Sequence, residues 1–274
     1  MSKRTPMQSK LLKLLYPAET PFVSDKDCAE YEKYYKHSIE PTSEVLNLDF
    51  VYPTSLGIEV EIETVSPIKT FLAPYWKAVE DGSLRNHGLE LVSIPLKPNQ
   101  VNRALMLLDT FYTAQKKAEF SHRCSIHVHL GVGELTMDQI EALITLYLTI
   151  EEALFVTLFP ERRGNTFCFP LKDTDLRANF IHKSGNLIEE ICKYSALNLY
   201  HLRDYNTLEF RHHGGTKNIK ELQYWLRILC ELYNSALKYS KEDILTELNL
   251  LSTTSAYVNY MNKMVPSFHP EVNR

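Results

Sequence analysis

The chain has 274 residues, of which 44% are apolar and 23% charged, a composition typical of a globular protein with one large domain or two small ones. Its formal net charge of −4 excludes a general electrostatic attraction to nucleic acid or to an anionic membrane surface. We therefore expect neither nucleic acid nor a membrane among its partners.

The five cysteines are odd in number, scattered and never spaced as Cys-x-x-Cys (Cys28, Cys124, Cys168, Cys192 and Cys230). This pattern argues against a disulfide framework or a zinc knuckle, and it predicts reduced thiols in a cytoplasmic protein. Residues 1–13 are basic and polar, without the apolar core of a signal peptide. The most apolar window, residues 140–159, carries three glutamates, so it predicts a buried helix rather than a membrane span.

The first half of the chain predicts a helical arm followed by alternating strands and helices. Residues 1–47 form the predicted arm, with a short helix at 11–15 and a second, tyrosine-rich helix at 25–37. Strands are expected over 46–52, 56–65, 77–79 and 89–94, with turns at 53–55 and 80–83. A helix is expected over 99–117 and a further strand over 124–132.

The second half begins with a helix start that the sequence marks clearly. Thr136 and Gln139 have the spacing of a capping box, which predicts a long helix that Pro160 stops. Residues 161–179 are polar and basic, which predicts a loop, and 187–194 suggest a helical turn. A hairpin of two strands, 196–202 and 207–212, is expected around residues 203–206. An amphipathic helix is predicted over 218–238, and a short helical pattern with a Pro-containing tail over 240–274.

This order of elements predicts an α+β fold, a largely antiparallel sheet with helices packed on one face. We expect three parts along the chain. These are the N-terminal helical arm at 1–47, a main domain at 48–240 and a C-terminal helical tail at 241–274.

Residues 56–63, Leu-Gly-Ile-Glu-Val-Glu-Ile-Glu, alternate apolar and acidic side chains, which places Glu59 and Glu61 on one face of a strand. Carboxylates spaced roughly 6–7 Å apart repel one another unless water or a cation lies between them. For this strand alone, an acidic face in water is an equally good interpretation. The alternation recurs, however, at Glu90, at His127 and His129, and at Glu209 and Arg211.

If these strands join one sheet, its polar face gathers four carboxylates, two imidazoles and a guanidinium. Carboxylates with one imidazole suit Mg²⁺ or Mn²⁺ better than zinc. Arg211 beside Glu209 offers a planar fork that matches phosphate oxygens. A metal on one side and an arginine on the other is the arrangement that phosphoryl transfer uses. Singly, His-x-His also arises by chance, and Glu-x-Arg is commonly a surface ion pair.

Seven segments occur in a recognisable order. They are Gly57-Ile-Glu59-Val-Glu61, Asp81-Gly-Ser83, Leu89-Glu90-Leu-Val-Ser93-Ile-Pro95-Leu, Ser125-Ile-His127-Val-His129-Leu-Gly131, Arg162-Arg163-Gly-Asn165-Thr-Phe-Cys168-Phe-Pro170-Leu, Tyr194-Ser-Ala-Leu-Asn198-Leu and Thr207-Leu-Glu209-Phe-Arg211-His-His213-Gly-Gly-Thr216. Together they resemble the amidoligase family of carboxylate–amine ligases over residues 50–240. The resemblance implies a fold like the catalytic domain of glutamine synthetase, with 48–240 as the amidoligase catalytic domain.

The resemblance also implies roles for single residues. The implied metal ligands are Glu59, Glu61, Glu90, His127 and Glu209. The implied nucleotide contacts are His129, Arg211, Arg162 and Arg163, and the implied substrate contacts are Asp81 and Asn198. Arg211, which would stabilise the transferring phosphoryl group, and Glu61 are the implied catalytic residues. One departure is Lys193, which stands where the family pattern leads us to expect arginine, and a lysine offers a point charge rather than a fork.

The implied reaction uses ATP and Mg²⁺ or Mn²⁺ to join a carboxylate to an amine through an acyl phosphate, forming an amide or isopeptide bond. Its partners would be an amino acid, peptide or protein substrate, with homo-oligomerisation left open. Two alternatives remain. A metal-dependent hydrolase could use the same carboxylates and histidines to activate water, but it leaves Arg211 without a role. A non-catalytic binding protein on the ligase fold is the other, although mutually repelling carboxylates argue against it.

Overall fold

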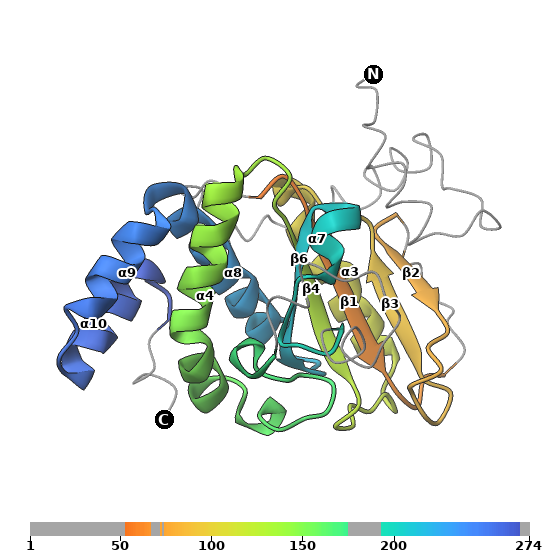
Figure 1. Ribbon diagram of the computed structural model, residues 1–274. Helices are drawn as coiled ribbons and strands as arrows, with labels where there is room; N and C mark the ends of the chain where they lie inside the picture. The colour runs from red at the N-terminus through yellow and green to blue at the C-terminus, as the bar shows by residue number, and fades with distance from the viewer. Residues whose placement is uncertain (1–52, 67–71, 73, 175–192, 269–274) are drawn as a thin grey trace, which may run out of the picture.

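The computed structural model describes residues 53–66, 72, 74–174 and 193–268. The predicted arm at 1–47, the strand at 46–52 and most of the helical turn at 187–194 lie outside these residues. The strands are β1 (Leu56–Ile62), β2 (Trp76–Val79), β3 (Leu89–Ser93), β4 (Ser125–Gly131), β5 (Leu197–Asn198) and β6 (Thr207–Gly214). The helices are α3 (Pro98–Ala114), α4 (Met137–Thr157), α7 (Tyr200–Tyr205), α8 (Ile219–Lys238), α9 (Lys241–Asn249) and α10 (Thr254–Met264), with 3₁₀ turns η1 (Pro160–Arg162) and η2 (Leu171–Asp173) (Figure 1).

Within the described residues, six strands form one sheet in the order β2-β3-β1-β4-β6-β5. Each pair of neighbouring strands is antiparallel. The central strands keep the alternation that the sequence predicts, and Ile58, Val60, Ile126 and Val128 are fully buried on one side. The prediction of an α+β fold with a largely antiparallel sheet is confirmed.

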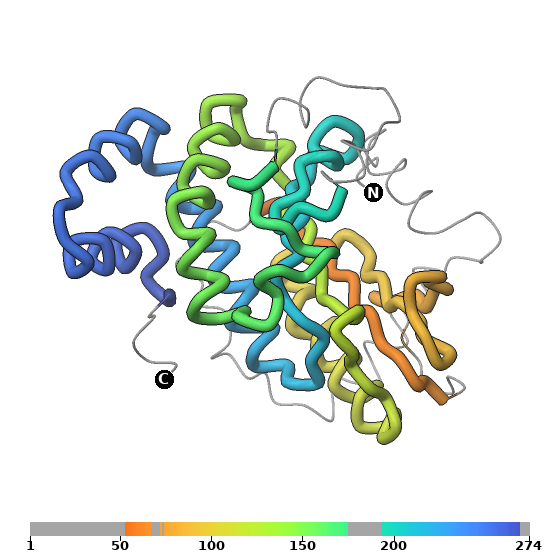
Figure 2. Tube along the Cα trace, turned by 60° about the horizontal axis from the view of Figure 1, so that its bottom comes forward, coloured from red at the N-terminus to blue at the C-terminus, as the bar shows by residue number. Residues whose placement is uncertain are grey.

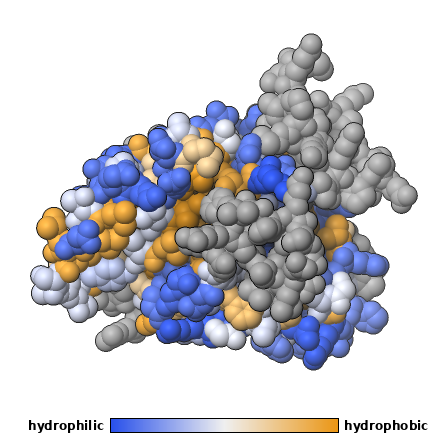
Figure 3. All heavy atoms as spheres, viewed as in Figure 1, coloured by the Kyte–Doolittle hydropathy of each residue, from blue (hydrophilic) through white to orange (hydrophobic). Residues whose placement is uncertain are grey.

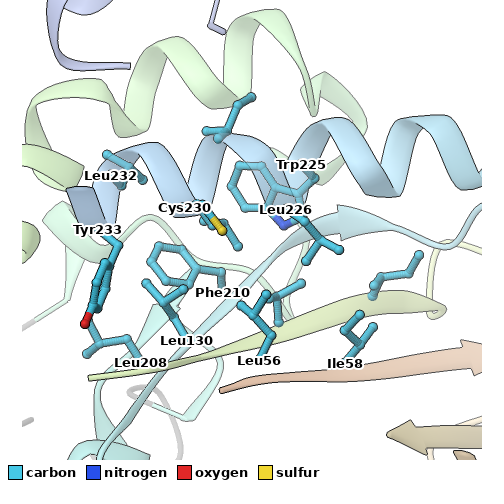
Figure 4. Packing of buried hydrophobic residues seen from close by; sticks show 14 of the residues in the cluster. Leu56, Ile58, Leu130, Leu208, Phe210, Trp225, Leu226, Cys230, Leu232 and Tyr233 are labelled. Carbon is cyan, nitrogen blue, oxygen red and sulfur yellow. The ribbon is translucent and has the colours of Figure 1, made fainter. Parts of the chain in front are cut away.

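The three longest helices cover this apolar face of the sheet. In α3, the carbonyl of Ala104 accepts a hydrogen bond of 2.7 Å from the indole of Trp76 on β2. Tyr147 of α4 meets the ring of Phe210 on β6 at a centroid distance of 5.8 Å. Figure 4 shows α8 lying over the sheet, with its apolar side chains directed at those of β1, β4 and β6 (Leu56, Ile58, Leu130, Leu208, Phe210, Trp225, Leu226 and Cys230). The opposite face is left for polar side chains.

The predicted helix starts are also present. Thr136 Oγ1 accepts from the backbone N–H of Gln139 at 3.2 Å, and the Gln139 side chain accepts from the N–H of Thr136 at 2.9 Å, which completes the capping box of α4. Asn218 caps α8 by accepting from the N–H of Lys220 at 3.1 Å. Among the described helices, none is both long enough and apolar enough to cross a membrane.

The C-terminal helices α9 and α10 lie beside α4 and α8, away from the sheet (Figures 1 and 2). Ile244, Tyr260 and Met264 are buried and belong to the same hydrophobic cluster as α4 and α8. On the face shown in Figure 3, hydrophobic residues also gather along α4, where Val156 is exposed.

The predicted strand at 196–202 is wrong over most of its length, because β5 has two residues and helix α7 follows at once. The side chain of Asn198 accepts from the N–H of Tyr200 at 2.9 Å, which turns the chain out of the sheet. At the other end, Asn206 has a left-handed backbone with φ of 52° and closes α7. As a result α7 lies in front of β6, on the polar face (Figure 1).

Candidate active site

Strand pairing between β1 and β4 places the carboxylate of Glu59 beside the imidazoles of His127 and His129. Glu59 is opposite His127, and its Oε2 lies 3.1 Å from His127 Nδ1. Gly57 is opposite His129, and a Cβ at Gly57 would lie 3.2 Å from the His129 Cβ, so glycine gives this histidine room. His129 Nε2 then lies 3.3 Å from Glu59 Oε1. Burial raises the pKa of Glu59, but His129 and His127 outweigh it, and the pKa is lowered overall.

Strand β3 adds a carboxylate on the other side of β1. Glu90 is opposite Glu61 in the register, and one ligand atom from each of Glu59, Glu90 and His127 lies within 4.8 Å of the others. Burial, and next the charges of Glu59 and Glu61, raise the pKa of Glu90 to about 9. This part of the face therefore holds more negative charge than its own cations neutralise.

A bulge in β6 sends two consecutive side chains in different directions. Val128 pairs with Phe210 and Ile126 with His213, so Arg211 and His212 together oppose the single residue His127. Arg211 turns toward the polar face, with Nη1 at 3.5 Å from His127 Nδ1. His212 turns toward the helices, where its Nε2 lies 2.9 Å from the hydroxyl of Tyr147.

Glu209 is the most completely surrounded carboxylate of the face. Its Oε2 accepts from Asn198 Nδ2 at 2.6 Å and lies 3.2 Å from His201 Nε2 on α7. Its Oε1 accepts from Arg211 and lies 3.5 Å from His127 Nδ1. Burial raises the pKa of Glu209, but Arg211, His201 and the other histidines lower it well below its usual value. Glu209 is therefore a buried carboxylate held in its charged form.

Ser125 connects Glu61 to the histidine. Glu61 Oε2 accepts from the backbone N–H of Ser125 at 2.8 Å and from its hydroxyl at 2.6 Å. The same hydroxyl lies 2.7 Å from His127 Nε2. Glu61 thus orients His127 through Ser125, in the way that outer carboxylates orient metal-ligating histidines.

Most of these side chains line one cavity of about 400 Å³. Its described lining is Glu59, Glu61, Glu80, Asp81, Gly82, Ser83, Glu90, Arg123, Ser125, His127, Phe167, Lys193, Tyr194, Asn198, His201, Glu209 and Arg211. Six of these residues are carboxylates and three are lysine or arginine. The imbalance favours binding of a cation.

The donor set fits a hard divalent metal ion. Two groups of ligand atoms are compact enough to share an ion, Glu59 with Glu90 and His127, and Glu59 with His129 and Glu209. Both offer two carboxylates and one imidazole, and no cysteine is among the described residues that line the cavity. Oxygen-rich sets of this kind suit Mg²⁺ or Mn²⁺.

The structure gathers most of the predicted site residues. Glu59, Glu61, Glu90, His127, Glu209, Arg211, Asp81 and Asn198 all line the cavity. Asn198 uses both ends of its amide within the protein, donating to Glu209 and accepting from Tyr200, so its contacts hold Glu209 in place. His129 pairs with Glu59 behind the lining, and its role as a phosphate contact stays a prediction.

The two arginines at 162 and 163 do not line the cavity. Arg162 is 2% exposed and donates to the backbone carbonyl of Arg211 at 3.1 Å. Arg163 is exposed and pairs with Glu152 of α4 at 2.5 Å. Their predicted contact with a nucleotide is not supported by these positions, and Arg162 instead fixes the backbone that carries Arg211.

Sequence reasoning missed several lining residues, above all Ser125, His201, Arg123 and Phe167. Ser125 shares the alternation of His127, so the same pattern could have predicted it on the polar face. His201 was hidden by the wrong strand assignment. Arg123 and Phe167 lie in loops, where no periodicity marks the direction of a side chain.

Comparison with known proteins identifies the family of the chain. A search of the curated proteins found no match. The model of the family described as "Putative amidoligase enzyme" matches residues 21–232, well over half of the chain. The chain therefore belongs to the amidoligase family.

Proposed function

We propose that the protein is an ATP- and Mg²⁺-dependent ligase that joins a carboxylate to an amine through an acyl phosphate, on a fold like the catalytic domain of glutamine synthetase. Membership of the amidoligase family supports ligation. The observation that carries the rest is the convergence of Glu59, Glu90 and His127 in one cavity with Arg211. A cation site facing an arginine suits transfer of a phosphoryl group.

Glu59 would hold the divalent cation with Glu90 and His127, or with His129 and Glu209. Glu61 would orient His127 through Ser125. When bound, the cation supplies positive charge to the triphosphate and polarises its oxygens. Mn²⁺ would serve in the same place, because its preferred ligands are similar.

In this proposal Arg211 acts on the phosphoryl group. Its Nε donates to the carbonyl of Phe167 at 3.3 Å, and its Nη1 contacts Glu209 and His127. Among the described residues, its Nη2 has no hydrogen-bond partner, and the side chain lines the cavity. A fixed guanidinium with one nitrogen to spare can donate to oxygens that gain charge during transfer, at little cost in reorganisation.

The proposed reaction has two steps. An oxygen of the substrate carboxylate attacks the γ-phosphorus of ATP, the bond to the β,γ-bridging oxygen breaks, and ADP leaves. The amine nitrogen then attacks the acyl carbon, the bond to the phosphate oxygen breaks, and the nitrogen loses a proton. Both partners of the first step are anionic, so the fixed cations of the cavity are needed to bring them together.

Incubation with ATP, Mg²⁺, hydroxylamine and a pool of carboxylic acids tests the proposal. Hydroxamate formed together with ADP is the expected result. Glu61→Gln removes the carboxylate that orients His127, so it should lower hydroxamate formation by roughly 10–100-fold without unfolding the protein. The matched control is Glu141→Gln, which changes an exposed carboxylate paired with Lys241 outside the cavity. Metal-dependent cleavage without ATP would favour the hydrolase instead. No turnover across a broad panel of acids would favour a binding protein.

A further inference from the structure

All three lysine and arginine side chains among the described residues of the cavity pack on one pair of aromatic rings. The guanidinium carbon of Arg123 lies 5.9 Å from the ring centroid of Phe167. Lys193 Nζ and the guanidinium carbon of Arg211 lie 5.6 and 5.9 Å from the ring centroid of Tyr194. The two rings themselves meet edge to face at 5.6 Å. We call these five residues the cationic wall.

The wall combines loop residues with Arg211 of β6, and hydrogen bonds orient both of its arginines. Arg123, just before β4, donates from Nη1 to the carbonyl of Ser83 at 3.1 Å. Phe167 accepts from Arg211 through its own carbonyl, and its N–H donates to the side chain of Asn165 at 2.9 Å. The segment that carries Phe167 follows α4 and runs beside β6 (Figures 1 and 2). Hydrogen bonds to backbone carbonyls therefore orient the guanidinium groups of Arg123 and Arg211.

The N–H groups of the wall make only some of the hydrogen bonds that they could donate. Arg123 Nε is buried and has no hydrogen-bond partner within the described residues. Lys193 is exposed, lines the cavity and packs its ammonium group on the ring of Tyr194. A cation above an aromatic face keeps its N–H groups available, because the ring accepts charge and not a directed hydrogen bond. The acidic residues Glu59, Glu90 and Glu209 also line the cavity, so the cavity presents both signs of charge.

We propose that Arg123 and Lys193 form an anion subsite that binds a carboxylate or phosphate group of the ligand beside Arg211. A guanidinium fork matches the paired oxygens of either group, and lysine adds a point charge. This inference deepens the proposed function, on which it rests only for the source of the anion. The anion comes either from the nucleotide triphosphate or from a carboxylate of the acid substrate other than the reacting one.

Calorimetric titration of the full chain in the presence of Mg²⁺ separates these sources. The probes are AMP-PNP, a non-hydrolysable nucleotide, and glutarate, a dicarboxylate. Arg123→Gln should lower the affinity for one of the two probes by about tenfold or more, the loss expected for a charge-assisted hydrogen bond. The probe whose affinity falls identifies the source of the anion. Phe167→Leu keeps all charges and should weaken the same probe, since Arg123 loses its support.

The matched control is Arg203→Gln, which removes an exposed arginine paired with Asp204 at 3.4 Å, outside the cavity. It should leave both affinities unchanged. Arg123→Lys keeps the charge without the fork and should give an intermediate loss, which provides a test if Arg123→Gln does not fold. Unchanged binding of both probes by Arg123→Gln, an equal loss in Arg203→Gln, or no binding of either probe by the wild type would each overturn the subsite. Because these titrations need no turnover, a failed hydroxamate assay with a positive titration would reject the ligase and keep the subsite.

Discussion

Glu90 lies directly opposite Glu61 in the antiparallel pair β1–β3, and both side chains line the same cavity. Like charges in this position destabilise a sheet. The protein offsets part of the cost at Glu61, which accepts two hydrogen bonds from Ser125, but the pKa of Glu90 is raised to about 9 by burial and by its acidic neighbours. The high cost of ionising Glu90 among its acidic neighbours is the clearest physical sign that this cavity is built for a cation.

The raised pKa of Glu90 predicts how stability depends on pH in chelator. Between its ordinary value of 4.5 and about 9, the folded protein keeps a proton that the unfolded chain has lost, so the free energy of unfolding falls as pH rises through this window. Glu90→Gln removes this dependence and should be more stable than the wild type at pH 9, with little difference near pH 4. Urea unfolding of the wild type and of Glu90→Gln across this pH range measures the two free energies of unfolding. Parallel curves for the two proteins would show that Glu90 ionises normally.

Glu59 belongs to both compact groups of ligand atoms, so its loss should affect metal binding most. Glu59→Gln should weaken Mn²⁺ binding by more than the roughly 10–100-fold that loss of an outer-shell partner costs. Calorimetric titration with Mn²⁺ measures the affinity, with Glu141→Gln as the surface control. Wild-type affinity in Glu59→Gln would remove it from the metal site.

Arg211→Lys should separate catalysis from metal binding. Lysine keeps a positive charge beside Glu209, but it cannot contact Glu209 and Phe167 and still present a free nitrogen to a phosphoryl group. We expect hydroxamate formation to fall by roughly 10³-fold or more, the range seen when a phosphoryl-stabilising arginine is lost. The affinity for Mn²⁺ should change little. Undiminished turnover would assign phosphoryl stabilisation to another group, and Arg203→Lys is the control.

On the apolar side of the sheet, Glu151 supports the segment that carries Phe167 of the cationic wall. Its fully buried carboxylate accepts from the Tyr147 hydroxyl at 2.6 Å and from the backbone N–H groups of Leu171 and Lys172 at 2.5 and 3.2 Å. Glu151→Ala should lower the free energy of unfolding by about 3 kcal/mol or more, because each orphaned buried donor costs roughly 1–3 kcal/mol.

The neighbouring Glu152 is the matched control for this change. It is exposed and pairs with Arg163 and Lys172, so Glu152→Ala should cost less than about 1 kcal/mol. Urea unfolding of both variants provides the comparison. Equal losses in the two would mean that the Glu151 hydrogen bonds add nothing beyond a surface pair.

The faces of the central strands could be predicted from sequence because a period of two is a local property. Glu59, His127 and Glu209 were placed on one face correctly, since each alternates with buried apolar residues. The bulge at Arg211 and His212 could not be predicted this way. Strict alternation would keep His213 on the face of Arg211, whereas the bulge pairs it with Ile126 instead.

Helix α7 and the wall depend on contacts between distant segments. The residues of α7 include Tyr200, Leu202 and Tyr205, which fit a strand by composition, and the turn that makes them helical is set by the side chain of Asn198. That helix supplies His201 to Glu209. Arg123 and Phe167 meet across 44 residues of sequence, so no local pattern could join them.

A crystal structure grown with Mn²⁺ and AMP-PNP tests the central claim most directly, because the anomalous signal of manganese locates the ion without reference to the ligands. We predict a peak in the cavity within coordination distance of Glu59 together with Glu90 and His127 or with Glu209, and the γ-phosphate within hydrogen-bond reach of Arg211. A nucleotide bound elsewhere, or a manganese peak that none of these carboxylates contacts, would contradict the account.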